Sequence, residues 1–316
     1  MYALLKKVER CMERHRMLSG EKLIYVAVSG GADSMCLLDL MLRLAPNFGF
    51  TVTVLHFNHK LRGAASDADE QFVRTYCGGR GISLIAGSSG APLKRGENAA
   101  REARYTFFAQ YAESVAVAHT ADDNAETMLM RLARGSGVSG LAGISPVALR
   151  GGLKIIRPII CLTRAEVLAY LEHNGIPHIE DESNGDTRFT RNRVRADIVP
   201  ILREINPKTA EHALALAEDL RSYDDYITRQ AETFLTSEGF TADNPRFGRK
   251  AFGELHPALA SKVLTLAANA MGIGLYREHI NEVLKLSSAN KGGWTLEFPN
   301  SVKLVCERNF LVFTIS

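Results

Sequence analysis

Short apolar runs alternate with longer stretches of helical periodicity through the first two-thirds of the chain. The apolar runs, which we predict to be strands, cover residues 23–29, 51–58, 82–85 and 115–118. Successive positions in them are apolar, as in parallel strands that are covered by helices on both faces. The helices that this pattern predicts cover residues 32–45, 66–79, 97–114 and 121–134. The alternation predicts an open, doubly wound and mostly parallel α/β sheet.

The pattern changes near Asn206 and Pro207. A long charged helix is predicted over residues 209–235, and two shorter helices are predicted over 257–271 and 276–286. Alternating apolar and polar positions then predict three short antiparallel strands, at residues 294–298, 302–306 and 310–314. We therefore predict two domains, residues 1–208 and a smaller α+β domain at residues 209–316.

Three predicted helices begin with the spacing of a capping box, in which a Ser or Thr precedes an acidic residue by three positions. These pairs start at Ser66, Thr120 and Thr163. Charged side chains interrupt an amphipathic helical pattern at the N-terminus, which argues against a secretory signal. No run of 18 apolar residues occurs, so we expect no membrane span and a cytoplasmic location.

The amino-acid composition excludes few classes of protein. Of the 316 residues, 46% are hydrophobic and 23% are charged, which is typical of a globular protein. A net charge of +3 does not by itself indicate a nucleic-acid partner. The five cysteines contain no C-x-x-C pair, which favours a reducing compartment and argues against a disulfide framework, a zinc site or an iron–sulfur cluster.

The strongest local signal is the hexapeptide that follows the first predicted strand. It consists of Ser29, Gly30, Gly31, Ala32, Asp33 and Ser34. The glycines permit a tight turn and close backbone approach, and the next helix directs N–H groups and its positive dipole end toward the loop. The two serines add hydroxyl donors. The alternative is a plain glycine turn with a helix cap. The place of the hexapeptide after the first strand nevertheless favours a site for phosphate or pyrophosphate.

Two other kinds of nucleotide-binding loop are considered for this chain. The absence of Gly-Lys-Ser/Thr after the hexapeptide excludes the phosphate loop of kinases and GTPases. Gly135, Gly137 and Gly140 match the dinucleotide-binding pattern G-x-G-x-x-G, but they follow a predicted helix instead of a strand. We therefore expect residues 135–143 to form a mobile, glycine-rich loop without a dinucleotide.

Polar side chains end the second predicted strand, in the motif His56-Phe-Asn58-His59. Two histidines three residues apart invite a metal interpretation, but no third ligand lies at a suitable spacing nearby. The carboxyl ends of parallel strands border the ligand crevice of such a sheet. We therefore predict that His56 and Asn58 contact a nucleotide.

A histidine and two acidic residues follow the fourth predicted strand. Asp123 and Glu126 share a helix face, and His119 lies just before that helix. Paired carboxylates here suit an ammonium group, Mg²⁺ or a proton transfer. Capping by Asp123 is an equally available structural role.

Two groups of arginines offer further cations. Arg101 and Arg104 share one face of a predicted helix, where surface ion pairs are the alternative to phosphate contact. Residues 188–203 contain five arginines, Arg191, Arg193 and Arg195 among them, against a single acid. Arginines without lysine suit bidentate contact with phosphate, although a solvated surface is the ordinary explanation.

Taken in order, these motifs resemble those of the tRNA(Ile)-lysidine synthetases, a family of PP-loop ATP pyrophosphatases. The series runs SGGADSM, HFNHKLRG, AREARY, AHTADDNAETMLMRLARGSGVSGLAGI, RPI, DESN at residues 181–184 and RNRVR, within residues 20–207. Thr120 and Asn124 depart from the pattern, because the family more often has His and Gln there.

The resemblance implies a ligase that forms lysidine at the wobble cytidine of tRNA(Ile) with a CAU anticodon. ATP adenylates the cytidine O2, pyrophosphate leaves, and the side-chain amine of L-lysine attacks C2 and expels AMP. It implies that Asp33 places Mg²⁺ or the nucleotide and that Asp123 and Glu126 hold the lysine ammonium. It also implies that three residues surround the activated cytidine: His119, Arg104 and Arg191.

The resemblance leaves two points open. Another PP-loop enzyme with a different nucleophile is the alternative function; a tRNA cytidine thiolase would need clustered cysteines, and a small-molecule synthetase would need no RNA. Residues 209–316 are expected to grip the tRNA, with a stability module or a homodimer contact as the alternatives.

Overall fold

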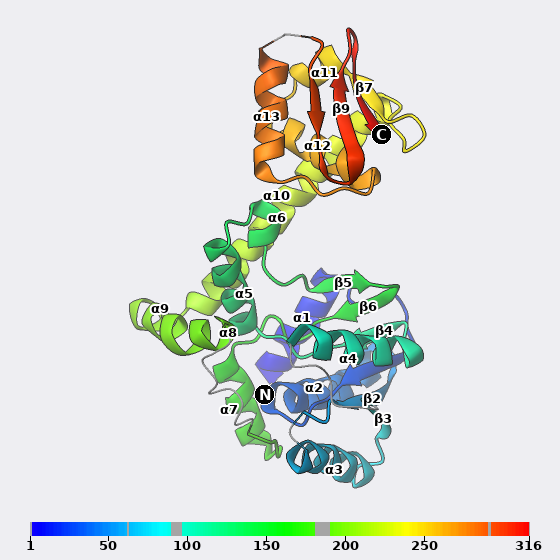
Figure 1. Cartoon of the computed structure of the whole chain (residues 1–316). Coiled ribbons are helices and arrows are strands. Elements are labelled where there is room, and N and C mark those ends of the chain that lie inside the picture. Colours follow the sequence, from blue (N-terminus) through cyan, green and yellow to red (C-terminus); the bar gives the residue numbers. More distant parts are fainter. Residues whose placement is uncertain (1, 62, 90–96, 181–189, 290–291, 316) are drawn as a thin grey trace. The chain divides into compact units, whose positions relative to one another are not determined.

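The computed structural model describes residues 2–61, 63–89, 97–180, 190–289 and 292–315. The chain forms two compact units, Met1–Glu218 and Asp219–Ser316, which are described separately (Figure 1). Their division lies ten residues beyond the predicted boundary at 208, inside the long helix α10, Thr209–Ser237. The boundary of the tRNA-contacting domain therefore stays a prediction.

The first unit contains a six-stranded sheet in the order β3-β2-β1-β4-β6-β5. The strands are β1 Leu23–Ala27, β2 Thr51–Asn58, β3 Ser83–Ser88, β4 Ser114–Ala116, β5 Val147–Arg150 and β6 Leu153–Ile156. All neighbours pair in parallel except β5, which pairs antiparallel with β6. This confirms the doubly wound, mostly parallel sheet. The strand order reverses between β1 and β4, which is where such sheets bind ligands.

The helices of this unit are shown in Figure 1. They are α1 Tyr2–Arg14, α2 Ala32–Phe48, α3 Ala64–Gly78, α4 Glu97–Tyr111, α5 Ala121–Ala133, α6 Val138–Leu141, α7 Arg164–Asn174, α8 Thr190–Arg193, the π-helix η2 Val194–Ile198 and α9 Val199–Ile205. Alternate strand residues pack into two different clusters: Val54 joins the core under α2, and Leu55 joins the core under α4. This two-sided burial explains why the strands are apolar at successive positions.

The predicted capping boxes at Thr120 and Thr163 are confirmed, but the one at Ser66 is wrong. In both confirmed boxes the threonine accepts from the backbone of the acidic residue, whose carboxylate accepts in return. The helix α3 starts earlier, with Gly63 as its N-cap, so Ser66 lies within its first turn. The predicted fourth strand is also shorter than expected and ends at Ala116.

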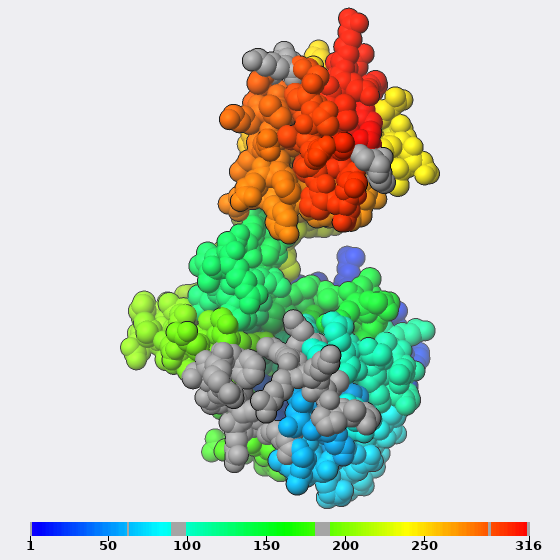
Figure 2. Space-filling model, in the orientation of Figure 1, coloured from blue at the N-terminus to red at the C-terminus, as the bar shows by residue number. Residues whose placement is uncertain are grey.

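The second unit has a core of its own around Phe247, Phe252 and Phe313. Its antiparallel sheet has the order β7-β10-β9-β8. The elements are β7 Arg246–Gly248, α11 Arg249–Gly253, α12 Pro257–Ala270, α13 Arg277–Ser288, β8 Thr295–Glu297, the 3₁₀ helix η3 Pro299–Ser301, β9 Val302–Cys306 and β10 Phe310–Ile315. Helix α13 and the last strands form its visible face in the space-filling view (Figure 2). Among the described helices of the whole chain, none is long and apolar enough to cross a membrane.

Candidate active site

The hexapeptide after β1 forms a tight loop that only glycine can close. Gly30 has a φ of 95°, and a Cβ placed there would lie 2.7 Å from the Cδ1 atom of Ile179. The backbone N–H of Ile179 donates to the Gly30 carbonyl at 2.9 Å and so holds the loop from outside. Gly31 caps α2 without any side-chain acceptor. The N–H groups of the first helical turn therefore remain directed at the loop mouth, as in anion sites.

The two serines of the loop mainly hold its shape. The Ser34 hydroxyl donates to the Gly31 carbonyl at 2.8 Å and accepts from the Ser29 backbone N–H at 3.2 Å. The two hydroxyl oxygens lie 3.2 Å apart. Because the Ser34 proton is already used inside the loop, the backbone N–H groups are the better donors for an anion.

Asp33 lies in the first turn of α2, where it forms an ion pair with Arg164 at the start of α7. Burial raises the pKa of Asp33, although the positive charge of Arg164 opposes this shift. The described residues contain no group of three His, Cys, Asp or Glu side chains that could hold a metal. One carboxylate beside a phosphate loop nevertheless fits Mg²⁺, which often takes one or two protein carboxylates together with substrate phosphates.

His56 and Asn58 lie at the carboxyl end of β2, beside the loop. The His56 ring contacts the Val28 carbonyl through Nδ1 at 2.8 Å, and burial lowers the pKa of the ring. Nδ1 is therefore the protonated nitrogen, and the buried Nε2 has no partner among the described residues. Asn58 donates to the Asp67 and Glu70 carboxylates at 2.9 and 3.0 Å. Both predicted nucleotide contacts thus also fasten the strand end to its neighbours.

His119 meets a buried arginine that sequence reasoning did not place among the site residues. The Arg157 Nε–H donates to Nδ1 of His119 at 3.2 Å, and its Nη1 donates to the Ser145 carbonyl at 2.6 Å. Burial lowers the pKa of His119, so the ring is neutral and carries its proton on Nε2. The site therefore holds His119 as a hydrogen-bond donor. Arg157 is 4% exposed. In the sequence, only its place in the RPI motif indicated that it could belong to the site.

Asp123 has the structural role of a cap and also belongs to a charged cluster. Its Oδ2 accepts from the Thr120 backbone N–H at 2.8 Å and from the Thr120 hydroxyl at 3.0 Å. Burial opposes ionisation of Asp123, but the positive charges of Arg191 and Arg195 and the hydrogen bond from the Thr120 backbone favour the carboxylate and lower its pKa. Asp123 is therefore an ionised carboxylate with its orientation fixed.

Two arginines form ion pairs with the carboxylates of Asp123 and Glu126. Arg191 donates to Asp123 Oδ1 at 2.8 Å and to Glu126 Oε2 at 3.0 Å. Arg195 donates from Nε to Glu126 Oε1 at 2.6 Å and from Nη2 to Glu126 Oε2 at 3.1 Å and Asp123 Oδ1 at 3.3 Å. We call these four residues the acid–arginine cluster. Glu126 is only 2% exposed. Arg195 was expected only as part of an arginine-rich motif.

A π-helical turn carries the second arginine of this cluster. The Val199 N–H donates to the Val194 carbonyl five residues earlier, and Pro200, which follows, has no N–H to donate. The extra residue of the π turn accommodates the proline within a helix that otherwise continues from α8 to α9. Such turns often occur at functional sites.

Asp122 has a structural role next to the cluster. Its carboxylate accepts from the Arg164 backbone N–H and from the Arg203 guanidinium. It therefore ties the start of α5 to the start of α7 and to α9.

The glycine-rich segment after α5 is more ordered than a mobile loop, because it contains the short helix α6. The Arg131 guanidinium donates to the Gly140 and Gly143 carbonyls at 2.7 and 2.8 Å. The Asn124 side chain accepts from the Ile144 N–H at 2.8 Å, and a Cβ at Gly143 would collide with it. As expected, this G-x-G-x-x-G match follows a helix and has no strand before it.

Arg104 is not one of the four residues of the acid–arginine cluster, and other predicted motif residues lie outside the described parts of the chain. Arg104 lies near His59, where burial and then the arginine charge lower the pKa of the histidine to about 4. The DESN motif at 181–184, Arg62 and Arg188 are outside the described residues.

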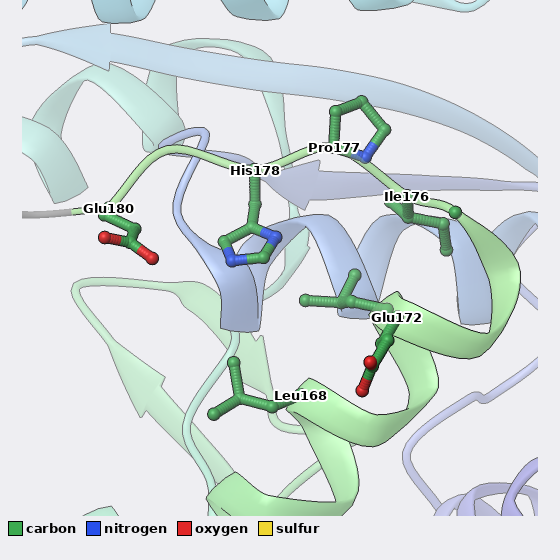
Figure 3. A pocket seen from close by; sticks show the side chains of 8 residues that line it. Leu168, Glu172, Ile176, Pro177, His178 and Glu180 are labelled. Atoms are coloured by element: carbon green, nitrogen blue, oxygen red, sulfur yellow. The ribbon is translucent and has the colours of Figure 1, made fainter.

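An open groove lies at the end of α7 (Figure 3). Its lining comes from α7 and the segment after it: Leu168, Leu171, Glu172, Gly175, Ile176, Pro177, His178 and Glu180. None of these residues belongs to the acid–arginine cluster or the loop. The chemistry therefore points to the loop and the cluster instead of this groove.

Asp123 acts electrostatically on both Asp33 and His119. Arg191 binds both Asp123 and Glu126. Asp33 lies in α2, which follows β1, and His119, Asp123 and Glu126 lie just before or in α5, which follows β4. Together with Arg191 from α8, they lie at the point where the strand order reverses.

The chain is similar to known proteins in its sequence and in its fold. Residues 3–202 match the PP-loop domain family. A solved structure of the U34-tRNA thiolase NcsA from Methanococcus maripaludis, with its [4Fe-4S] cluster, shares the fold with a TM-score of 0.56 at 17% identity, over 69% of this chain and 78% of that one.

Three curated relatives carry the name tRNA(Ile)-lysidine synthase. They come from Geobacter sulfurreducens (36% identity, 98% of this chain), Dehalococcoides mccartyi (34%, 83%) and Symbiobacterium thermophilum (34%, 95%). The chain spans 69%, 59% and 67% of their respective lengths. With the motifs and the loop geometry already in place, these matches show that the chain belongs to the tRNA(Ile)-lysidine synthase family of PP-loop proteins.

Proposed function

We propose that this protein joins L-lysine to C2 of the wobble cytidine in tRNA(Ile) with a CAU anticodon, with ATP cleaved to AMP and pyrophosphate. The observation that carries this proposal is the placement of a phosphate loop and a carboxylate pair at the same reversal of strand order. The first suits the departing pyrophosphate and the second suits an amine nucleophile. A tRNA substrate also supports the cytoplasmic location expected from the sequence.

The loop residues serve the first half of the reaction. Gly30, Gly31 and Ala32 present backbone N–H groups, and the α2 dipole adds positive potential where negative charge develops on the leaving pyrophosphate. His56 and Asn58 keep the end of β2 beside this loop. Mg²⁺, held by Asp33 and the substrate phosphates, would neutralise charge on the leaving group.

The cluster serves the second half. Asp123 and Glu126 hold the lysine ammonium and place the amine near the activated cytidine. A carboxylate there accepts the proton that the amine must lose before it attacks C2. His119 donates from Nε2, and Arg104 and Arg191 stabilise negative charge around the adenylated base.

The second unit is proposed to grip the tRNA. Its separate core means that it folds around its own residues. Its role is distinguished from a stability function by deletion: loss of residues 219–316 should weaken tRNA binding and leave ATP binding intact. An unchanged affinity for tRNA would assign the unit to stability or self-association instead.

The test of the overall proposal is incorporation of radiolabelled lysine into acid-precipitable RNA. Purified protein is incubated with Mg²⁺ and a tRNA(Ile) transcript with the CAU anticodon, with and without ATP. The proposal expects label in the RNA only when ATP and this transcript are both present. Pyrophosphate release without incorporation of lysine would show that the enzyme uses a different nucleophile.

A further inference from the structure

All four carboxylate oxygens of Asp123 and Glu126 already accept hydrogen bonds. The Asp123 Oδ2 atom serves the cap at Thr120, and the other three oxygens accept from the two guanidiniums. The two positive charges balance the two negative charges. A lysine ammonium that arrived at this cluster would meet no net negative charge and would lie next to two cations.

The ammonium therefore needs one guanidinium to leave. Both arginines contact both carboxylates, but the Arg191 side chain is 26% exposed and the Arg195 side chain is 41% exposed. The more exposed partner loses less on moving into water or onto another anion. Arg195 is the guanidinium that can leave more easily.

The phosphate loop offers the destination. Burial lowers the pKa of Arg195, but Glu126, Asp123 and Asp33 together raise it above the ordinary value. The loop and the cluster follow the neighbouring strands β1 and β4, so the Arg195 guanidinium and the loop lie at the same edge of the sheet. Arg164, which pairs with Asp33, is another cation beside the loop. A polyphosphate in the loop adds several negative charges, which an arginine fork binds in a bidentate manner.

We propose that Arg195 is a positioning residue that covers the ammonium site of Glu126 until a polyphosphate occupies the loop. The phosphate then draws the Arg195 guanidinium away, and the exposed carboxylates accept the lysine side chain. Lysine binding is therefore coupled to nucleotide binding, and nucleotide binds first. This inference rests on the proposed function, because it takes Asp123 and Glu126 as the lysine site.

The test is lysine affinity measured by calorimetry, which does not depend on turnover. Lysine is titrated into wild-type protein alone and with α,β-methylene ATP and Mg²⁺, a nucleotide that cannot lose pyrophosphate. Wild type should bind lysine at least about tenfold more tightly with the nucleotide, a coupling within the usual range for linked sites. Arg195→Ala should bind lysine at least about tenfold more tightly than wild type when no nucleotide is present.

Two further variants separate covering from a general structural effect. Arg195→Lys keeps a cation near Glu126, so its nucleotide-free affinity should stay close to that of wild type. Arg193→Ala is the matched control, because Arg193 is 70% exposed and pairs with Asp197 on its own helix. It should bind lysine as wild type does under both conditions.

The outcomes distinguish this inference from the function on which it rests. If Arg195→Ala, folded by circular dichroism, binds lysine no more tightly than wild type without nucleotide, the covering role is wrong. If Glu126→Gln binds lysine as tightly as wild type with nucleotide, the lysine site itself is wrong. Loss of lysine binding in Glu126→Gln together with tighter binding in Arg195→Ala supports both.

Discussion

The phosphate loop and the acid–arginine cluster lie at the ends of two adjacent strands, but they are built in different ways. The loop is a backbone structure, closed by Gly30 and fixed by hydrogen bonds among Ser29, Gly31 and Ser34. The cluster consists of side chains from α5, α8 and η2, and its carboxylates bind the protein's own arginines. In the proposed function, the first region is ready for its anion, whereas the second exchanges one cation for another.

This difference decides how each region responds to mutation. A backbone site fails when the chain can no longer adopt its shape, whatever side chain remains. A side-chain site changes its affinity in proportion to the charges and hydrogen bonds that are altered. The following substitutions separate these two behaviours.

The largest effect is expected for Gly30→Ala. The positive φ disfavours alanine, and the new Cβ must displace Ile179, so the loop shifts away from its anion-binding shape. We expect a loss of about 100-fold in kcat/KM for ATP, since small misplacements at a reacting centre have effects of that size. The stability loss should be about 1–2 kcal/mol. Steady-state kinetics and urea unfolding give the two values.

Gly49→Ala is the matched control for that substitution. Gly49 has a φ of 70° at the end of α2, but a Cβ there meets nothing within 4 Å. It should lose about 1 kcal/mol of stability and keep its activity. Equal activity in the two variants would show that the shape of the loop does not matter for ATP.

A smaller effect is expected for Thr120→Ala. The variant loses the cap of α5 and one hydrogen bond to Asp123, so it should lose about 1 kcal/mol of stability and raise the KM for lysine about fivefold. Thr163→Ala removes an equivalent cap from α7, where Glu166 also pairs with Lys7. That control should be similarly destabilised with an unchanged KM. A rise in KM in both variants would trace the effect to stability alone.

The smallest effect is expected for the stability of Asp33→Asn. Because burial raises the pKa of Asp33, the folded state binds its proton more tightly than the unfolded chain does. Ionisation at neutral pH therefore lowers stability, and this loss disappears as the pH falls through the raised pKa. The asparagine variant should be more stable than wild type at pH 7, by less than about 1 kcal/mol, with the difference shrinking toward pH 4.

Asp67→Asn should show the opposite sign in the same unfolding experiment. Hydrogen bonds from Lys60 and then from Asn58 lower the pKa of Asp67. Its ionised form therefore stabilises the fold at neutral pH, and that contribution is lost as the pH falls. Equal pH profiles for the two variants would contradict the assigned pKa directions.

Sequence patterns predicted the backbone features of this molecule well. The parallel strands, the loop after β1 and two capping boxes follow from periodicity and from short-range spacing. The β5–β6 hairpin was missed, although its signal was present: Gly151 and Gly152 both have positive φ in a two-residue turn. The cap at Ser66 failed because Gly63 starts the helix three residues earlier.

The side-chain partnerships could not be predicted in the same way. Arg157 meets His119 across 38 positions of sequence, and Arg195 meets Glu126 across 69. The partners of a long side chain depend on how the folded backbone brings distant segments together. The spacing of residues along a short stretch of sequence does not determine those partners. Which arginine pairs with which acid therefore required the structure.

The exchange of cations at Glu126 is the central claim, and nitrogen-15 NMR of arginine-labelled protein tests it most directly. The Nε–H resonance of Arg195, assigned by its absence in Arg195→Lys, is followed while α,β-methylene ATP and Mg²⁺ are added without lysine. The account predicts that this resonance shifts on nucleotide addition and that later addition of lysine leaves it in place. A resonance that ignores the nucleotide and moves only with lysine would contradict the account.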